Sequence, residues 1–334
     1  MLKIFKMKRV LGIGNALVDI MTLIDDDKIL NKFDLPKGSM QLVDRVKSEN
    51  IKAGTKHFSM TFTSGGSAAN TIHGLAMLGL ETGFIGSVGN DETGDFFEKD
   101  MKSAGVNTFL FRQNTITGSA LALITPDSER TFATHLGAAV ELNAADLKAE
   151  LFKGYDILYL EGYLINNLPL MEAACKLAKK NKILVALDLS SYNVVESNLS
   201  VFEKIVKEYV DILFANEQEA KAFTGLVPEK ALNQMSDSSE VVILKVGSEG
   251  SLLKRREEVI KISPLPVKCN DTTGAGDLYA AGFLYGFAHG LNLEKCGLIG
   301  TLLAGNVIET IGARMNKLKF TEIKKSIAKI IKEK

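Results

Sequence analysis

The stretch that decides the fold is "NDTTGAGDLYAAGFLYGFAHG", which runs from Asn270 to Gly290. It places an acid, two threonines and two glycines ahead of a long apolar segment, with a second acid, Asp277, where a helix is expected to begin. Glycine inside a regular element lowers stability, so the cluster requires an explanation from backbone geometry or from a ligand. We expect the helix to run from about Asp277 to His289, with Gly290 in the C′ position that ends it.

Two interpretations of this loop compete. Gly274 and Gly276 allow a sharp turn that points successive amide N–H groups into one concavity, and the helix N-terminus adds about half a positive charge there. Such a concavity suits a phosphoryl group. An aspartate at a helix start is also ordinary capping chemistry, which an isolated GxGD pattern would favour. Capping requires neither the additional acid nor the threonines, so we favour an anion site.

Composition places the chain among large globular proteins. It has 334 residues, 46% of them hydrophobic, and 40 basic side chains balance 40 acidic ones. The length is typical of about two domains. Zero net charge gives no indication of a nucleic acid or an anionic membrane as partner. The lysine-rich end, Lys324 to Lys334, is short and amphipathic, and we expect it to be a solvated helix face rather than an anchor.

The cysteines and the N-terminus indicate a cytoplasmic protein. Cys175, Cys269 and Cys296 are odd in number and lack zinc-type or CxxC spacing, as expected in a reducing compartment. No apolar run approaches the roughly 18 residues that span a bilayer. The start lacks the features of a signal peptide, and it is Met1 or Met7. The histidines show no metal-site spacing, and we expect all of them to be structural: His57, His73, His135 and His289.

Apolar β-rich runs alternate with helical patterns along most of the chain. Continuous apolar strands separated by helices indicate a parallel sheet covered on both faces. We therefore expect an α/β fold with a doubly wound, mostly parallel sheet. The expected strands are "RVLGIGNA", "TGFIGSVG", "DILYLEG", "KILVALDLS", "DILFANE" and "VVILKVG". The expected helices span residues 68–78, 92–104, 168–180, 201–208 and 217–223.

Two stretches interrupt this rhythm. Residues 19–44 and 107–134 resemble strands joined by turns, one of them at Pro126 to Arg130. Paired in one small sheet over the ends of the main strands, they would form a lid. We accordingly expect a core domain of residues 1–18, 45–106 and 135–334, and a small β lid domain of residues 19–44 and 107–134.

At this point the residues resemble a known family. "DTTGAGD" and, about 200 residues before it, "TSGGSAANTIHGLAMLGL" (Thr63 to Leu80) resemble the two signatures of the ribokinase-like (PfkB) sugar and nucleoside kinases. The resemblance covers Arg9 to about Met315. It implies that Asp277 is the base that accepts the proton of the substrate hydroxyl. It also implies that the transferring γ-phosphoryl group lies against the backbone amides of Gly274, Ala275 and Gly276.

The resemblance also implies an acceptor site at the end of the first strand. A carboxylate accepts hydrogen bonds from two vicinal hydroxyls, so Asp19 suits a ribose diol. The alternative interpretation of Asp19 is a solvent-exposed charge at the end of a strand, without a ligand. The implied partners of Asp19 are Asn15, Gly65, Gly66 and Asn70.

The resemblance implies ATP and Mg²⁺ as cofactors, with K⁺ as an additional ion in many members. "FANEQEAKAF" resembles the family's N-x-x-E motif, so Asn216 and Glu219 are candidates for phosphate and magnesium, Glu219 acting through water. Ordinary helix capping explains the same two residues equally well. Further cofactor-binding candidates are Lys245, Gly247, Thr272 and Asn306, although Lys245 is also explained as a lysine that emerges at a strand end. Asp271 and Thr273 match ligands of a monovalent cation in many members.

Three other interpretations of the sequence are weaker. "GIGNAL" has Leu17 in place of the third glycine of a dinucleotide fingerprint, which argues against an NAD-dependent oxidoreductase. A P-loop is excluded, because GxxxxGK[ST] is absent from the sequence. A regulator that has lost its chemistry would show damage in the signature, and the signature is intact.

The acceptor remains open between two classes. Ser67 stands where ribokinases usually carry lysine, and "GGS" and "GNALVDI" resemble adenosine kinases. Four apolar lid residues would cover a purine or would pack the lid onto the body: Met21, Leu23, Met40 and Leu42. Glu161 favours a sugar, because sugar kinases of this family hold hydroxyls with an acid near there. We expect adenosine, phosphorylated at its 5′-hydroxyl, with a free sugar such as ribose or fructose as the alternative. Monomer and homodimer are both possible.

Overall fold

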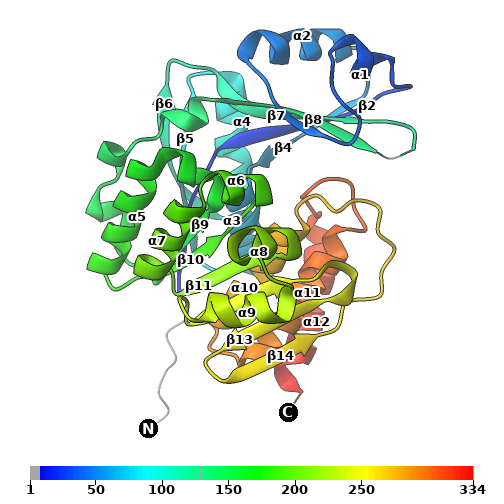
Figure 1. The fold of residues 1–334 in the computed structure, drawn as a ribbon. Helices are drawn as coiled ribbons and strands as arrows, with labels where there is room; N and C mark the ends of the chain where they lie inside the picture. Colours follow the sequence, from blue (N-terminus) through cyan, green and yellow to red (C-terminus); the bar gives the residue numbers. More distant parts are fainter. Residues whose placement is uncertain (1–7, 128, 334) are drawn as a thin grey trace.

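A computed structural model describes residues 8–127 and 129–333 (Figure 1). The choice between Met1 and Met7 as the start lies outside these residues. The body is built on a nine-stranded sheet in the order β14-β13-β12-β11-β10-β9-β1-β5-β6. Its strands pair in parallel, except that β13 is antiparallel to both neighbours. The strands are β1 (Val10–Ile13), β5 (Thr82–Gly89), β6 (Val106–Gln113), β9 (Ile157–Glu161), β10 (Leu184–Asp188), β11 (Ile212–Asn216), β12 (Val241–Lys245), β13 (Ser251–Arg255) and β14 (Glu258–Ile262).

Successive strand residues point to opposite sides of this sheet, so both faces carry apolar side chains, and helices cover both. Val10 belongs to one apolar cluster, whereas its neighbour Leu11 belongs to the other. The first cluster contains side chains of α3 (Ser67–Leu78), α4 (Glu92–Ser103), α10 (Ala275–Ala288), α11 (Leu293–Val307) and α12 (Lys317–Lys332). The second contains side chains of α5 (Leu168–Lys180), α6 (Tyr192–Ser197), α7 (Leu199–Tyr209), α8 (Glu217–Thr224) and α9 (Pro228–Ser236). The expected doubly wound α/β fold is confirmed.

A second, five-stranded sheet lies above the body in Figure 1 and has the order β3-β8-β7-β2-β4. Leu30 of α1 and Ile51 of α2 belong to the same buried apolar cluster as Ile20 and Leu121 of this sheet. We call this unit the lid. Its elements are β2 (Leu17–Leu23), α1 (Lys28–Lys32), β3 (Met40–Leu42), α2 (Arg45–Thr55), β4 (Met60–Gly65), β7 (Thr117–Ile124) and β8 (Arg130–Gly137).

The lid differs from its sequence-based outline in two segments. Residues 106–113 form β6, which pairs with β5 at the edge of the main sheet. An edge strand keeps half-exposed side chains, so its pattern resembles that of a lid strand. Conversely, β4 pairs with β2 in the lid, although its "MTFTSG" has too few apolar residues to predict a strand. The helix α2 also contacts lid strand β8.

Candidate active site

The helix α10 begins at Ala275, two residues earlier than expected. Its N-cap is Gly274, whose φ of 75° is left-handed and therefore favours glycine. A Cβ at this position would also stand 2.5 Å from Cβ of Ala313. Asp277 consequently lies inside the first turn of the helix and does not cap it, since no side chain caps the helix start. The capping interpretation of Asp277 is thus wrong, and its carboxylate points elsewhere.

The Asp277 carboxylate is held by the start of α3. Ser67 Oγ donates to Oδ1 over 2.7 Å, and Asn70 Nδ2 donates to Oδ2 over 2.9 Å. Burial raises the pKa of Asp277 to about 6, while these two hydrogen bonds act in the opposite direction. The carboxyl is therefore mostly ionised at neutral pH, and its pKa lies in the range that general-base catalysis favours.

The start of α3 is itself placed by a glycine and a buried acid. Gly66 has φ of 98°, and a Cβ there would stand 2.1 Å from the carbonyl oxygen of Asn15. Glu161 at the end of β9 accepts from the Ala68 amide over 2.8 Å and from Asn15 Nδ2 over 2.6 Å. Both oxygens of Glu161 are thus engaged by protein donors, and burial raises its pKa to about 7. The Glu161 carboxylate fixes the orientation of the Asn15 side chain.

Asp19 comes into the site from lid strand β2, where it pairs with Thr63 of β4. Its carboxylate lies over Gly65, where a Cβ would stand 2.1 Å from Asp19 Oδ1. Burial raises the pKa of Asp19 to about 7, and the Arg314 guanidinium opposes this rise. Arg314 donates through Nε and Nη2 to the carbonyl of Ser64, over 3.0 and 2.6 Å. A half-buried cation therefore lies close to Asp19 and holds the residue before the two glycines.

One cavity of about 730 Å³ connects the lid with the loop before α10. We call it the acceptor cavity, because most of the residues predicted to bind the acceptor line it. Asp19 and Asp277 both line it, so an open cleft reaches from the lid acid to the acid at the start of α10. Asn70 Oδ1 is buried and accepts no hydrogen bond from the described residues, so a ligand hydroxyl would satisfy it. Of the remaining predicted acceptor residues, Asn15, Gly66 and Glu161 line this cavity, whereas Gly65 does not.

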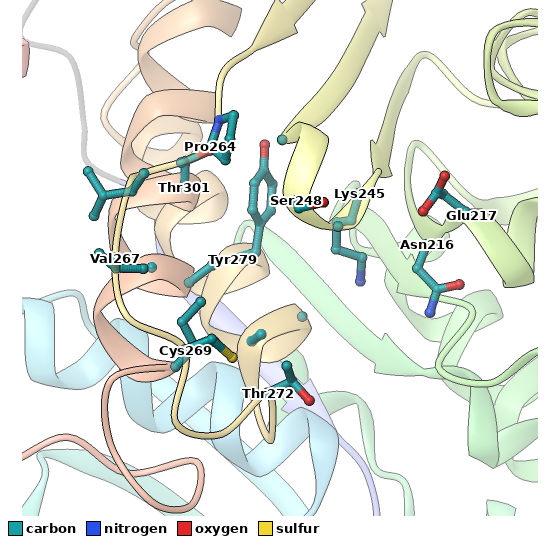
Figure 2. Close-up of a pocket in the computed structure, with 18 of the residues that line it drawn as sticks. Asn216, Glu217, Lys245, Ser248, Pro264, Val267, Cys269, Thr272, Tyr279 and Thr301 are labelled. Carbon is teal, nitrogen blue, oxygen red and sulfur yellow. The ribbon is translucent and has the colours of Figure 1, made fainter.

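A second cavity of about 740 Å³, which we call the donor cavity, adjoins the first (Figure 2). Figure 2 shows Pro264, Val267 and Cys269 along one side, Asn216 and Lys245 on the other, and Thr272 below them. Gly247, another of the predicted cofactor-binding residues, also lines this cavity. Asn306 does not: its Nδ2 donates to the Leu302 carbonyl over 2.7 Å, and Ala304, Gly305 and Ile308 line the wall instead.

Lys245 lies where the two cavities meet, since it lines both together with Asn216 and Gly276. Its Nζ donates to Asp188 Oδ2 over 2.8 Å and stands 3.1 Å from where a Cβ on Gly276 would be. Burial lowers the pKa of Lys245, but the neighbouring Asp188 and Glu219 outweigh it and raise the pKa. A fixed ammonium thus lies beside the amides that start α10.

Asn216 and Glu219 form a capping box at the start of α8. Asn216 Oδ1 accepts from the Glu219 amide over 2.9 Å, and Glu219 Oε2 accepts from the Asn216 amide over 2.8 Å. Capping therefore occupies both residues, but each lines the acceptor cavity as well. Burial raises the pKa of Glu219, and Lys245 opposes this rise. The two interpretations of this motif are compatible.

Asp271 has a role that the sequence does not indicate. Its Oδ1 accepts from Arg130 Nη1 of the lid and, over 2.7 Å, from the Thr273 amide. Its Oδ2 accepts from the Gly312 amide. Both oxygens therefore face N–H donors, which does not fit the cation site that the resemblance implies at Asp271 and Thr273.

Sequence reasoning missed three side chains of this site. Asp188 ends an apolar strand, as many structural acids do, and only its contact with Lys245 distinguishes it. The sequence draws attention to Ser67 only because ribokinases usually carry lysine at this position, although the Ser67 hydroxyl holds Asp277. Arg314 follows "IGA" in an unremarkable loop. A lone acid at the carboxyl end of a buried parallel strand is the one available signal, because such ends converge at one edge.

Comparison with known proteins agrees with this geometry. Residues 38–319 match the pfkB family of carbohydrate kinases. The chain belongs to this family. It is an ATP-dependent phosphotransferase with an alcohol group as acceptor, of the sugar or nucleoside kinase type. Kinases of this family use ATP, typically with Mg²⁺.

Relatives carry more than one acceptor name. The chain is 31% identical over 247 residues to a protein of Archaeoglobus fulgidus named "Uncharacterized sugar kinase", covering 72% of this chain and 96% of that one. It is 30% identical over 268 residues to a 5-dehydro-2-deoxygluconokinase of Listeria innocua, covering 75% and 82%. The crystal structure of adenosine kinase from Sinorhizobium meliloti has a TM-score of 0.86 and 33% identity, covering 96% of this chain and 99% of that chain.

The described residues contain neither a membrane-spanning helix nor a cluster of metal ligands. Over residues 8–127 and 129–333, no helix combines the length and the apolar character needed to cross a membrane. In the same part of the chain, no three or more His, Cys, Asp or Glu side chains group in a way that could hold a metal ion.

Proposed function

We propose that this kinase transfers the γ-phosphoryl group of ATP to the 5′-hydroxyl of adenosine or a closely related nucleoside. The supporting observation is the lid end of the acceptor cavity, which is apolar and solvent-accessible. Met40 and Leu42 of β3 line it and are 52% and 66% exposed. Exposed apolar side chains in a cleft favour an apolar ligand group, which a purine has and a bare sugar lacks.

The four apolar lid residues separate into two groups. Met21 packs the lid onto the body, since its Sδ stands 2.6 Å from where a Cβ on Gly312 would be. Leu23 does not line the acceptor cavity. Met40 and Leu42 face the cavity together with Phe132 of β8, whose ring offers a stacking surface. The packing interpretation therefore applies to Met21, and we propose the purine-covering role for Met40 and Leu42.

In the mechanism that we propose, the acceptor ribose lies between the lid and α3. Asp19 accepts hydrogen bonds from its vicinal hydroxyls, and Asn15, oriented by Glu161, accepts or donates beside it. The 5′-hydroxyl then reaches Asp277, which takes its proton late in the transfer, as phosphoryl transfer requires little base assistance early on. Gly274 and Gly276 present amides to the migrating group, and Lys245 adds a fixed positive charge. The Ala275 amide, also predicted to face the phosphoryl group, donates instead to the Thr272 carbonyl over 3.1 Å.

At the meeting point of the cavities the described acids form no direct metal-ligand cluster, so we propose that Mg²⁺ would be bound there through water. Asp188, Glu219 and Asp277 are three acids near one cation, Lys245, and burial and mutual repulsion raise the pKa of Glu219 and Asp277. Surplus carboxylate charge suits a hard divalent cation, which keeps most of its waters. Asp188 and Glu219 would hold Mg²⁺ through water, where it would neutralise phosphate charge. In the donor cavity, Thr272 and Gly247 would contact ATP.

A free-sugar kinase is the second candidate. The relatives named as sugar kinases support it, and so does Glu161 as an acid on the cavity wall. Against it, both Glu161 oxygens already accept protein hydrogen bonds, so the carboxylate has less capacity for sugar hydroxyls.

An acceptor panel tests the proposal. ADP release is measured with ATP·Mg²⁺ and adenosine, inosine, ribose, fructose or 5-dehydro-2-deoxygluconate. We expect kcat/KM for adenosine to exceed that of each sugar by at least about 100-fold, or about 2.7 kcal/mol. Phe132→Ala is expected to lower kcat/KM for adenosine by about 5-fold to 100-fold, as loss of a stacked ring does, and to leave a sugar almost unaffected. A sugar that outperforms adenosine rejects the nucleoside assignment.

A further inference from the structure

The Asp271 carboxylate is an enclosed charge at the base of the loop of residues 270–276 that leads into α10, which we call the phosphate loop. Its side chain is fully buried, and the Arg130 side chain that pairs with it is only 12% exposed. Asp271 lies three residues before Gly274, and the amides of Asn270 and Asp271 donate to the Ile308 carbonyl over 2.7 and 3.0 Å. Asp271 thus fastens the base of the loop that presents the phosphate-facing amides.

The donors around Asp271 determine what kind of group can neutralise it. A monovalent cation requires oxygen atoms whose lone pairs face it, whereas both Asp271 oxygens face N–H groups. One of these donors, Arg130, already carries a full positive charge, and a second cation beside it would be repelled. Since the pair is buried, solvent and salt screen it little. The site as built therefore accepts a guanidinium and does not fit an inorganic ion.

We propose that the Arg130 guanidinium takes the place of the monovalent cation expected at this loop. It neutralises Asp271 from within the chain, orders the backbone before α10, and makes K⁺ or Na⁺ unnecessary. Arg130 opens strand β8, so the same ion pair ties the lid to the phosphate loop. This inference rests on the proposed function only for its turnover readout. Arg130 is a positioning residue here, acting through Asp271.

The first test compares salts at constant ionic strength. Thermal melting of the wild-type protein is recorded in choline, sodium and potassium chloride, and turnover is recorded with whichever acceptor of the panel releases ADP. We expect both to be the same in all three salts, within about twofold for rate. A rate increase of several fold with K⁺, or a melting temperature that K⁺ raises, overturns the proposal. Melting requires no acceptor, so this outcome is independent of the adenosine assignment.

The second test removes the guanidinium and returns it from solution. Arg130→Ala leaves Asp271 with no cationic partner, so we expect a lower melting temperature and at least about tenfold lower turnover. Low millimolar guanidinium chloride is expected to restore part of both, whereas choline chloride is not. Arg130→Lys keeps the charge without the planar fork and is expected to lie between the two, which keeps the test usable if the alanine variant folds poorly.

A matched control distinguishes this effect from general action of the reagent. Arg45→Ala removes an arginine of the same lid whose partner, Glu49, is exposed. This control is expected to melt and turn over like the wild type, and to gain nothing from guanidinium. If Arg130→Ala matches the wild type, or gains no more from guanidinium than the control does, the guanidinium is not the group that orders the loop.

Discussion

At the scale of single residues, the Asp277 carboxylate is placed by two side chains from α3, so the group that we propose as the base is fixed before a substrate arrives. In Asp277→Asn the amide keeps the volume and one acceptor for Ser67, so the fold is expected to persist. Turnover is expected to fall by about 10²–10⁴, the usual contribution of a general base. Removal of a buried charge leaves the melting temperature equal or higher.

The check combines steady-state ADP release with thermal melting. For the wild type, log kcat is expected to rise as pH increases through the Asp277 pKa of about 6 and then to level, because only the ionised carboxylate accepts a proton. The variant is expected to lack this limb. An exposed substitution such as Ser197→Ala serves as control. An Asp277→Asn enzyme that melts normally and turns over at the wild-type rate contradicts the assignment of the base.

The residue types of this site were predictable where they belong to a local motif. Asp277 and Asn70 stand within the two signatures and lie together in the structure. The supporting residues were not, because their roles arise from contacts between distant segments: Ser67 meets Asp277 across 210 positions, and Arg314 meets Ser64 across 250. Nothing in the sequence around Arg314 distinguishes it from an ordinary surface arginine.

At the scale of elements, the loop of residues 309–316 between α11 and α12 connects the lid to the phosphate loop. Gly312 donates to Asp271, Ala313 packs on Gly274, and Arg314 donates to Ser64 at the end of β4. Ser64 Oγ in turn donates to Asp100 over 2.6 Å. The geometry of the double-glycine turn therefore depends on a segment that belongs to neither signature.

Arg314→Met tests this connection. Hydrogen bonds from a charged group are worth about 1.5–3 kcal/mol, so we expect a lower melting temperature and a KM for the acceptor raised by about tenfold or more, with a smaller change in kcat. Loss of the cation also raises the pKa of Asp19 further, so KM is expected to worsen as pH falls. Arg314→Lys, which keeps the charge, is expected to retain the wild-type pH dependence.

The measurement is the acceptor KM and kcat of each variant between pH 6 and 8. Lys317→Met, an exposed neighbour, is the control. If Arg314→Met only melts earlier and leaves KM and its pH dependence unchanged, the loop supports the fold but not the acceptor site.

Elements were predicted well where packing is uniform on both faces. "TGFIGSVG" is buried throughout and forms β5 over Thr82–Gly89, as expected. Prediction failed for β6 and β4, since one is a half-exposed edge strand and the other is polar. Pairing partners, not local patterns, decide to which sheet such strands belong.

At the scale of the whole molecule, the cleft concentrates carboxyl groups that burial keeps partly protonated. Burial raises the pKa of Asp19 and Glu161 to about 7 and of Asp277 to about 6, and it also raises the pKa of Glu219. The two signatures allowed the fold to be predicted, but not this clustering, which arises only when the lid, β9, α8 and α10 meet. Ionising these neighbouring buried carboxyls lowers the stability of the ligand-free protein.

This cost gives the ligand-free protein a stability that falls as pH rises. A carboxyl with a raised pKa in the folded state binds more protons there than in the unfolded chain, so its contribution is complete below about pH 4 and is lost by about pH 7. His73 acts oppositely below about pH 6.5, because burial lowers its pKa, but it is one group against four. Between pH 5 and 8 we expect the free energy of unfolding to fall by at least about 2 kcal/mol, since one pKa unit in one group corresponds to about 1.4 kcal/mol.

Denaturant titrations at several pH values measure this slope. Asp19→Asn removes one of the groups and is expected to flatten it, whereas Asp34→Asn, an exposed substitution in the lid, is not. A slope of the opposite sign would show that the carboxyls of the empty cleft are ionised at the acid end of this range.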